Sequence, residues 1–334
     1  MAQAIPRLTG LGFSVPANIR TNDDPIFDWL KAHGGGEGLF TGYNQRRVLV
    51  PGEDLMTIML PAAQNAMADA GLFASDIDLL IGMGSVSAFV TPNDICRAHY
   101  LLGLPESCPV VPLTREFSSF NYGVVMADAL IRAGRAHNVL IVAGTNWTRH
   151  VSYHTPQSIS AGDGAGAAVV SLSSDGSRWS LMDDLSITQT QFYGTMFMRG
   201  DSLDPIPPQT GPLFTDSYFH ITKEGIETYK QFGIVTAPSA VSQVLARNGL
   251  KGSDVAMTAH QSSSVLLDAW VQTIQPAQLL STITNFANMT GATIPVNVAW
   301  APGNNPVTPN YLVCLALGPE AHADAMLLQR EPVT

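Results

Sequence analysis

The sequence predicts an α/β fold in which mixed or parallel sheets are covered by helices. Short apolar runs typical of buried strands alternate with helical segments, and this alternation occurs in both halves of the 334 residues. Hydrophobic residues make up 46% of the chain and charged residues only 13%, so the chain can bury a large core. We therefore expect two similar halves, residues 1–175 and 176–334, packed as one or two α/β domains.

The first half is predicted to contain several strands and helices in alternation. The strand candidates are residues 8–15, 78–85, 110–114, 138–145 and 166–174. The helix candidates are residues 55–70, 92–102 and 121–133. Gly134 follows the last of these helices and is a typical helix end.

The second half begins after a polar turn, SSDGSRWS (residues 173–180), which would join the two halves. Its strand candidates are residues 180–189, 254–261, 279–286, 311–318 and 324–330. Its helices are expected near residues 223–248 and 263–274. Residues 189–220 contain Pro205, Pro207 and Pro208 and are too irregular for a regular element, so we expect a loop over a site.

Composition and charge argue against several classes of protein. The net charge is −10 and there is no run of lysine or arginine, which argues against broad nucleic-acid binding. No apolar segment reaches the roughly 18 to 20 residues of a membrane span. The first ten residues lack the features of a signal peptide, so we expect a cytosolic protein. Cys96, Cys108 and Cys314 have no paired metal-ligand spacing, which fits a reducing compartment and predicts no metal site.

A nucleophile would be well placed where the apolar run at residues 110–114 turns into the helix that begins near Asn121. The chain has to turn sharply between Phe117 and Ser119. Such a turn exposes a side chain beside free backbone N–H groups and the positive end of a helix dipole. These groups stabilise a thiolate or an oxyanion.

Four further motifs follow one another in a characteristic order. They are FTGYNQRRVLVPGED (residues 40–54, with Gly42, Arg46 and Val48), AGDGAGAAVV (161–170), TAHQSSS (258–264) and NFANMTGATIP (285–295). With these motifs the chain resembles a ketoacyl-acyl-carrier-protein synthase III over nearly its full length. The resemblance implies the thiolase fold, a layered αβαβα arrangement of two similar halves. For residues 161–170 a tight structural turn is favoured over a dinucleotide loop, because the G-x-G-x-x-G pattern is absent.

The resemblance implies an acyltransferase. In such enzymes a cysteine thiolate accepts an acyl group from coenzyme A or a carrier protein, and a second substrate attacks the acyl-enzyme. The motifs assign to His260 and Asn288 the hydrogen bonds to the thioester carbonyl of that second substrate. Without the motifs, His260 would more often be a structural histidine and Asn288 a turn residue.

Phe117 stands where the family carries its cysteine, by alignment without a gap from Ala127, Asp128 and Gly134. A phenylalanine cannot form a thioester. Three explanations stay open: the nucleophile has moved to Ser118 or Ser119, the chain is a naturally silent member, or it is a cysteine-to-phenylalanine variant of an active enzyme. Under the first two, direct transfer to an acceptor activated by His260 is also open.

Other positions also depart from the family. GPEAHADA (residues 318–325) replaces the family's Gly-rich turn, and Pro319 removes a backbone donor near the place of the second oxyanion group. The residues expected to hold the adenine of coenzyme A are not evident, and Arg46, Trp147 and Arg149 are the candidates for binding this donor. A solvated face is the alternative for Arg46.

No permanently bound cofactor is expected, and the acyl donor would be an acyl-CoA or a phosphopantetheine-linked thioester. Residues 191–200 (QFYGTMFMRG) suit an adaptable apolar wall of the substrate site and equally a core. The resemblance also implies a homodimer in which residues 85–94, and Phe89 in particular, reach the neighbouring site. An acyl carrier protein is a further candidate partner.

The function that these inferences predict is acyl transfer or carbon–carbon condensation in secondary metabolism, with the usual nucleophile absent. The alternative is a non-catalytic thiolase-fold subunit that partners an active homologue.

Overall fold

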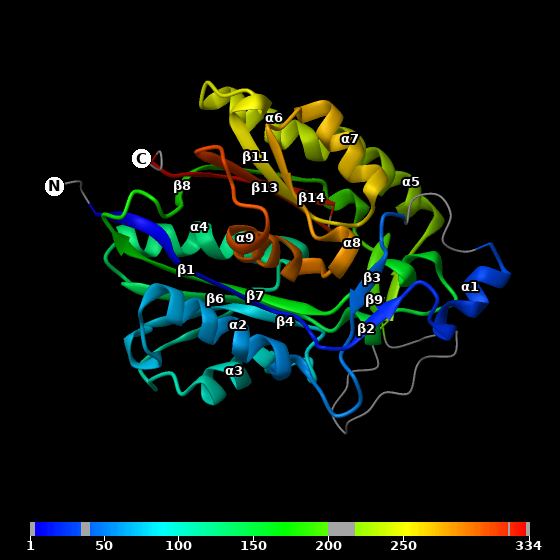
Figure 1. Cartoon of the computed structure of the whole chain (residues 1–334), viewed down its shortest axis with the longest axis horizontal. Coiled ribbons are helices and arrows are strands. Elements are labelled where there is room, and N and C mark those ends of the chain that lie inside the picture. The colour runs from blue at the N-terminus through cyan, green and yellow to red at the C-terminus, as the bar shows by residue number, and fades with distance from the viewer. Residues whose placement is uncertain (1–3, 35–40, 200–217, 320, 332–334) are drawn as a thin grey trace.

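The structure is a computed structural model that describes residues 4–34, 41–199, 218–319 and 321–331. Two five-stranded sheets alternate with three sets of helices as the five layers of an αβαβα arrangement (Figure 1). Helices α4 (Ser119–Arg132) and α9 (Thr293–Asn304) lie between the two sheets. The layered α/β class predicted from the sequence is confirmed.

The first sheet is formed by strands from the amino-terminal half of the chain. In spatial order these are β1 (Ile5–Ser14), β7 (Gly164–Ser173), β6 (Asn138–Thr145), β4 (Leu79–Ser85) and β5 (Val110–Pro112). Strands β6, β4 and β5 run parallel, whereas β7 is antiparallel to both of its neighbours. The outer face is covered by α2 (Leu55–Ala70) and α3 (Asp94–Leu102).

The second sheet repeats this topology with strands from the carboxyl-terminal half. In spatial order these are β8 (Ser180–Thr188), β14 (His322–Gln329), β13 (Tyr311–Gly318), β11 (Val255–Ala259) and β12 (Gln278–Leu280). Strands β13, β11 and β12 run parallel, and β14 is antiparallel to both of its neighbours. Its outer face is covered by α5 (Lys223–Gln231), α6 (Ala237–Arg247) and α7 (Ser264–Ile274).

Helix α4 is held between the sheets by a stripe of apolar side chains. Phe120, Val124, Ala127 and Ile131 are all buried, and their spacing of four, three and four residues places them on one face of the helix. This packing fixes the axis of α4 and therefore the direction of the turn that precedes it. Among the helices within the described ranges, none has the length and apolar character needed to cross a bilayer.

Two sequence predictions about local structure are wrong. Residues 279–286 are not one strand, because the chain leaves β12 after Leu280 and forms the short helix α8 (Ile283–Phe286). Residues 189–220 contain an antiparallel pair, β9 (Met196–Arg199) and β10 (Tyr218–Ile221), so regular structure does occur there. The three prolines of residues 189–220 lie outside the described residues. The helical structure expected over residues 223–248 is present as α5 and α6, which are joined by a π-helical turn at Phe232–Thr236.

The motif at residues 161–170 forms a structural turn into β7, in agreement with the reading favoured from the sequence. The carboxylate of Asp163 is fully buried and accepts hydrogen bonds from the backbone N–H groups of Leu49 (2.8 Å) and Thr148 (3.0 Å). The Thr148 hydroxyl donates a third, at 2.6 Å. Burial raises the pKa of Asp163, while these hydrogen bonds act to lower it. Asp163 therefore ties three separate segments together.

Candidate functional site

The candidate site is built around the turn between β5 and α4. Residues Glu116–Ser118 form a single 3₁₀ turn, and α4 begins directly afterwards at Ser119. Glu116 has a φ of 41°, which lies in the left-handed region that non-glycine residues rarely adopt. The backbone N–H of Arg115 donates to the Ser119 hydroxyl at 3.0 Å. The turn therefore presents Glu116 and Phe117 away from the helix axis.

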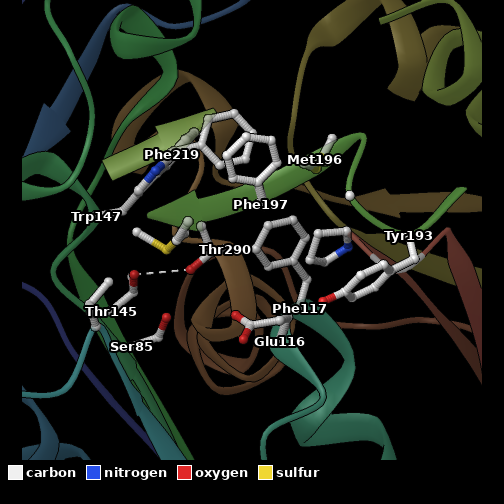
Figure 2. Close-up of a pocket in the computed structure, with 14 residues that line it drawn as sticks. Ser85, Glu116, Phe117, Thr145, Trp147, Tyr193, Met196, Phe197, Phe219 and Thr290 are labelled. Carbon is white, nitrogen blue, oxygen red and sulfur yellow. Dashed lines mark hydrogen bonds between the residues drawn. The ribbon is translucent and has the colours of Figure 1, made fainter. Parts of the chain in front are cut away.

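Both of these side chains line a cavity of about 710 Å³ (Figure 2). The described residues around it are Ser85, Val86, Glu116, Phe117, Thr145, Trp147, Tyr193, Gly194, Met196, Phe197, Met198, Phe219, Thr290 and Pro319. Five of these lie within residues 191–200, so this aromatic and methionine-rich segment forms a cavity wall. Phe192 and Met196 of the same segment also pack against the core of the second half. On the polar side, the hydroxyls of Thr145 and Thr290 are hydrogen-bonded at 2.9 Å.

His260 lies behind Phe117. The two rings stack in parallel, with centroids 4.7 Å apart and an angle of 3° between their planes. His260 is 3% exposed and is not among the described residues that line the cavity. Burial lowers its pKa to about 4, and a backbone hydrogen bond with Thr290 acts in the opposite direction. The imidazole is therefore neutral at pH 7, and its buried Nδ1 has no hydrogen-bond partner within the described part of the chain.

Asn288 is fixed by its backbone and its side chain. Its N–H donates to the carbonyl of Ser160 at 2.8 Å, and its carbonyl accepts from Gly162 at 3.0 Å. Its side-chain Oδ1 accepts from the backbone N–H of Thr290 at 2.8 Å. Thr290 lines the cavity, whereas Asn288, like His260, is not among the described lining residues and lies behind that wall.

Ser118 and Ser119, the candidate replacement nucleophiles, are turned away from this cavity. Ser118 is fully buried, donates to the carbonyl of Arg115 at 3.1 Å and contacts Nε2 of His322. Ser119 is 1% exposed and packs on the sulfur of Met83. Neither serine is among the described cavity-lining residues, so attack by either on a ligand there would require the turn to rearrange.

A polar clamp, which no sequence pattern indicated, holds the turn to the second sheet. Arg115 donates two hydrogen bonds to Asp324, at 3.2 Å from Nε and 3.1 Å from Nη2, and the Ser186 hydroxyl contacts the same carboxylate. Nε2 of His322 lies 3.7 Å from Asp324 and also contacts Ser118. In a Ser-His-Asp triad the two ring nitrogens each face one partner, so this shared nitrogen indicates a structural network. His322 and Asp324 come from the segment that departs from the family's Gly-rich turn.

The candidate donor-binding residues differ in their placement. Arg46 is fully buried and donates to Asn22 (2.8 Å) and the carbonyl of Ile159 (2.6 Å), so it is neither solvated nor placed to bind a phosphate. Trp147 lines the cavity and meets the Phe219 ring edge to face at 5.9 Å.

Arg149 is 9% exposed, and its guanidinium donates to the carbonyl of Val50 at 2.9 Å.

The segment expected to reach a neighbouring site, residues 85–94, is exposed at Phe89 and Val90. Phe89 is 46% and Val90 93% accessible to solvent. Ser85 and Val86, at the start of the same segment, line the cavity.

Comparisons with known sequences agree with these features. The family described as 3-oxoacyl-[acyl-carrier-protein (ACP)] synthase III matches residues 113–185, which include the Phe117 turn, β6 and β7. A β-ketoacyl-[acyl-carrier-protein] synthase III from Rhodospirillum rubrum is 25% identical over 321 residues, covering 92% of this chain and 94% of the relative. Synthase III 1 of Vibrio vulnificus is 28% identical over 300 residues, covering 86% and 88%.

Solved structures show the same fold. The 3-oxoacyl-(acyl carrier protein) synthase III of Pseudomonas aeruginosa superposes with a TM-score of 0.79 at 22% identity, covering 99% of both chains. The priming β-ketosynthase from the R1128 polyketide biosynthetic pathway gives a TM-score of 0.82 at 19% identity, covering 99% of this chain and 98% of the other. The solved structures show that the chain has the thiolase fold, and the family match and sequence relatives show that it is ketoacyl-acyl-carrier-protein synthase III-like.

Proposed function

We propose that this chain is an acyltransferase of secondary metabolism that moves an acyl group from a coenzyme A or carrier-protein thioester to an acceptor. The observation that carries the proposal is the position of residue 117. It lies on the turn before α4, at the cavity wall, and directly against the ring of His260. The relatives are named β-ketoacyl- or 3-oxoacyl-[acyl-carrier-protein] synthase III, and these names support the same chemistry.

His260 and Asn288 are proposed to bind the thioester carbonyl of the second substrate. A neutral imidazole donates from one nitrogen and accepts at the other, and an amide nitrogen donates only. The Asn288 amide nitrogen would supply one donor, because its Oδ1 is held by the N–H of Thr290. The His260 N–H would supply the second by exchanging its Thr290 partner for the substrate oxygen. Such preorganised donors stabilise developing negative charge, and losing one typically costs on the order of 10² to 10³ in rate.

Phe117 blocks this arrangement in the present chain. Its ring lies over the face of His260, where the second substrate would have to bind. A cysteine at this position is shorter and would leave the face of His260 open to the cavity. We therefore propose that a cysteine at position 117 restores both the covalent nucleophile and access to the catalytic pair.

The experiment compares the chain with Phe117→Cys by intact-protein mass after incubation with acyl-CoA and acyl-carrier-protein thioesters. We expect an acyl mass gain in the cysteine variant, with Phe117→Ala as the control that opens the cavity without a nucleophile. A gain in the unmodified chain that Ser118→Ala abolishes would show instead that serine is the nucleophile. No gain in any variant would refute acyl-enzyme formation.

A second candidate is a non-catalytic subunit that pairs with an active homologue. It is favoured by the ring of Phe117 over His260 and by the burial of both adjacent serines. An active enzyme should form a homodimer through the segment that carries Phe89, whereas a silent subunit should be poorly soluble alone and purify with its partner. Since the proposed thioesters are intracellular metabolites, we place the protein in the cytosol.

A further inference from the structure

Asn288 lies between two residues whose backbones are strained. Ala287 has a φ of 58° and Thr290 a φ of 44°, and both angles lie in the left-handed region that residues with a side chain rarely adopt. Ala287 also has a ψ of −144°, which places it close to a region that is populated almost only by glycine. Such a conformation persists only where the surrounding structure holds it. The contacts of Ala287 therefore decide where Asn288 lies.

The carbonyl of Ala287 is held by the side chain of Gln261. Nε2 of Gln261 donates to this carbonyl at 2.9 Å. Both residues are fully buried, so loss of Gln261 would leave the carbonyl without a solvent partner. The N–H of Ala287 donates to the carbonyl of Ile283 at 3.1 Å and closes α8. The orientation of the peptide that joins Ala287 to Asn288 therefore depends on Gln261.

Gln261 is itself fixed by partners from three other parts of the chain. Its Oε1 accepts hydrogen bonds from the backbone N–H of Thr282 (2.8 Å), the Ser281 hydroxyl (3.0 Å) and Nδ2 of Asn297 (3.0 Å). A backbone N–H only donates and a carbonyl only accepts, so these partners also fix which end of the amide is Oε1. Asn297 is fully buried as well, and its Oδ1 accepts from the Thr282 hydroxyl at 2.6 Å. Gln261 is therefore a rigid support for the peptide before Asn288.

We propose that Gln261 is a positioning residue for the acyl transfer proposed above. Its hydrogen bond opposes relaxation of the Ala287 backbone and keeps the Asn288 amide where it can donate to the substrate carbonyl. Without Gln261, Ala287 is free to relax to a negative φ, and the Asn288 side chain moves with its peptide. The role in acyl transfer rests on the proposed function of Asn288, whereas the support of the backbone by Gln261 does not.

The test measures amide hydrogen exchange by NMR, without any reaction. The reporter is the Thr290 N–H, which donates to Oδ1 of Asn288 at 2.8 Å. Gln261→Met should lower the protection of this N–H at least about tenfold more than that of amides in the centre of β13, which report global unfolding. Gln278→Met is the matched control, because Gln278 also uses both ends of its side-chain amide, but on residues 305–308. It should lower the protection of both sets of amides equally.

The strain at Ala287 predicts a rescue. Adding Ala287→Gly to Gln261→Met should recover most of the lost protection at Thr290, because glycine adopts this φ and ψ without a steric cost. A network that only stabilises the fold predicts no recovery, since glycine supplies no hydrogen bond to it. Equal losses at Thr290 and in β13, or no recovery with glycine, would each overturn the proposal.

The unmodified protein supplies a second measurement in case Gln261→Met does not fold. The side-chain amide protons of Gln261 should persist in the spectrum at about pH 8, whereas those of the exposed Gln243 should be lost to exchange. Equally rapid loss at Gln261 would overturn the proposal, because the Ala287 carbonyl would then not hold this amide. Absence of an acyl-enzyme in Phe117→Cys would remove the proposed function, while the exchange results would still decide whether Gln261 supports Asn288.

Discussion

Replacing Phe117 with alanine should raise the pKa of His260. The pKa of this histidine is about 4, against an ordinary value of 6.5, and burial is the main cause. The Phe117 ring covers one face of the imidazole at 4.7 Å, and the protein covers the other. If desolvation is shared by the two faces, uncovering one should raise the pKa by about 1 unit, which corresponds to roughly 1.4 kcal/mol.

The measurement is an NMR titration of the imidazole resonances, with His260→Gln used to assign them. Phe219→Ala is the matched control, because Phe219 also lines the cavity but packs on Trp147 rather than on His260. It should leave the pKa near 4. A pKa that stays near 4 in Phe117→Ala would refute the reasoning, since the remaining protein would then account for the burial.

The low pKa of His260 in the folded chain also makes the free energy of unfolding depend on pH. Because the folded pKa of His260 lies below the unfolded value, protonation favours the unfolded chain. The neutral imidazole contributes about 3 kcal/mol to the free energy of unfolding. This contribution is complete above pH 6.5 and is lost as the pH falls through 4. His260→Gln should therefore show a flatter decline in denaturant-derived stability between pH 7 and pH 4 than the unmodified chain. Parallel declines would contradict this assignment.

Three further predictions concern the clamp, the proposed dimer and the packing of α9 on β7. Asp324→Asn leaves a partly buried guanidinium without its carboxylate and should cost about 2 to 3 kcal/mol in urea unfolding, whereas Asp128→Asn, whose arginine partner is half exposed, should cost under about 1. Phe89→Asp should convert the proposed dimer to a monomer in sedimentation velocity, and Phe73→Asp, at another exposed phenylalanine, should not. Gly166→Val should destabilise the protein by about 1 to 3 kcal/mol, because an added Cβ would lie 2.6 Å from a side-chain carbon of α9.

Contrary outcomes would be equally informative. Equal costs for the two aspartate variants would mean that the clamp contributes no more than a surface ion pair. A dimer that survives Phe89→Asp would place the interface elsewhere. An unchanged midpoint for Gly166→Val would mean that α9 can shift away from β7 at little cost.

Most of the fold could be predicted from the sequence because its elements carry local signals. The apolar run of β6 and the helical pattern of α4 depend only on neighbouring residues, so their positions were recognisable. Helix α9 could not be predicted because it contains Pro295 and Pro302. Its first six residues are also all buried, so the usual amphipathic pattern is absent. The pair β9 and β10 escaped because its strands are four residues long and are separated by proline-rich sequence.

The candidate site was less predictable because its contacts join distant parts of the chain. His260 and Asn288 were proposed from motifs, but their common link through Thr290 depends on how separate segments of the second half fold together. The clamp joins Arg115 to Asp324 across 209 positions, and no local pattern encodes that pairing. Arg46 was misplaced because a charged residue in a polar segment suggests a surface, whereas here backbone carbonyls surround it.

The clamp and Phe117 together explain how the proposed site could keep its shape without a cysteine at position 117. A shorter side chain at position 117 would leave an empty space against His260, and the Phe117 ring fills that space by stacking. The turn itself is held by Arg115 and Ser118, neither of which depends on the identity of residue 117. Phe117→Cys should therefore preserve the turn. That independence is what makes the exchange a test of chemistry rather than of folding.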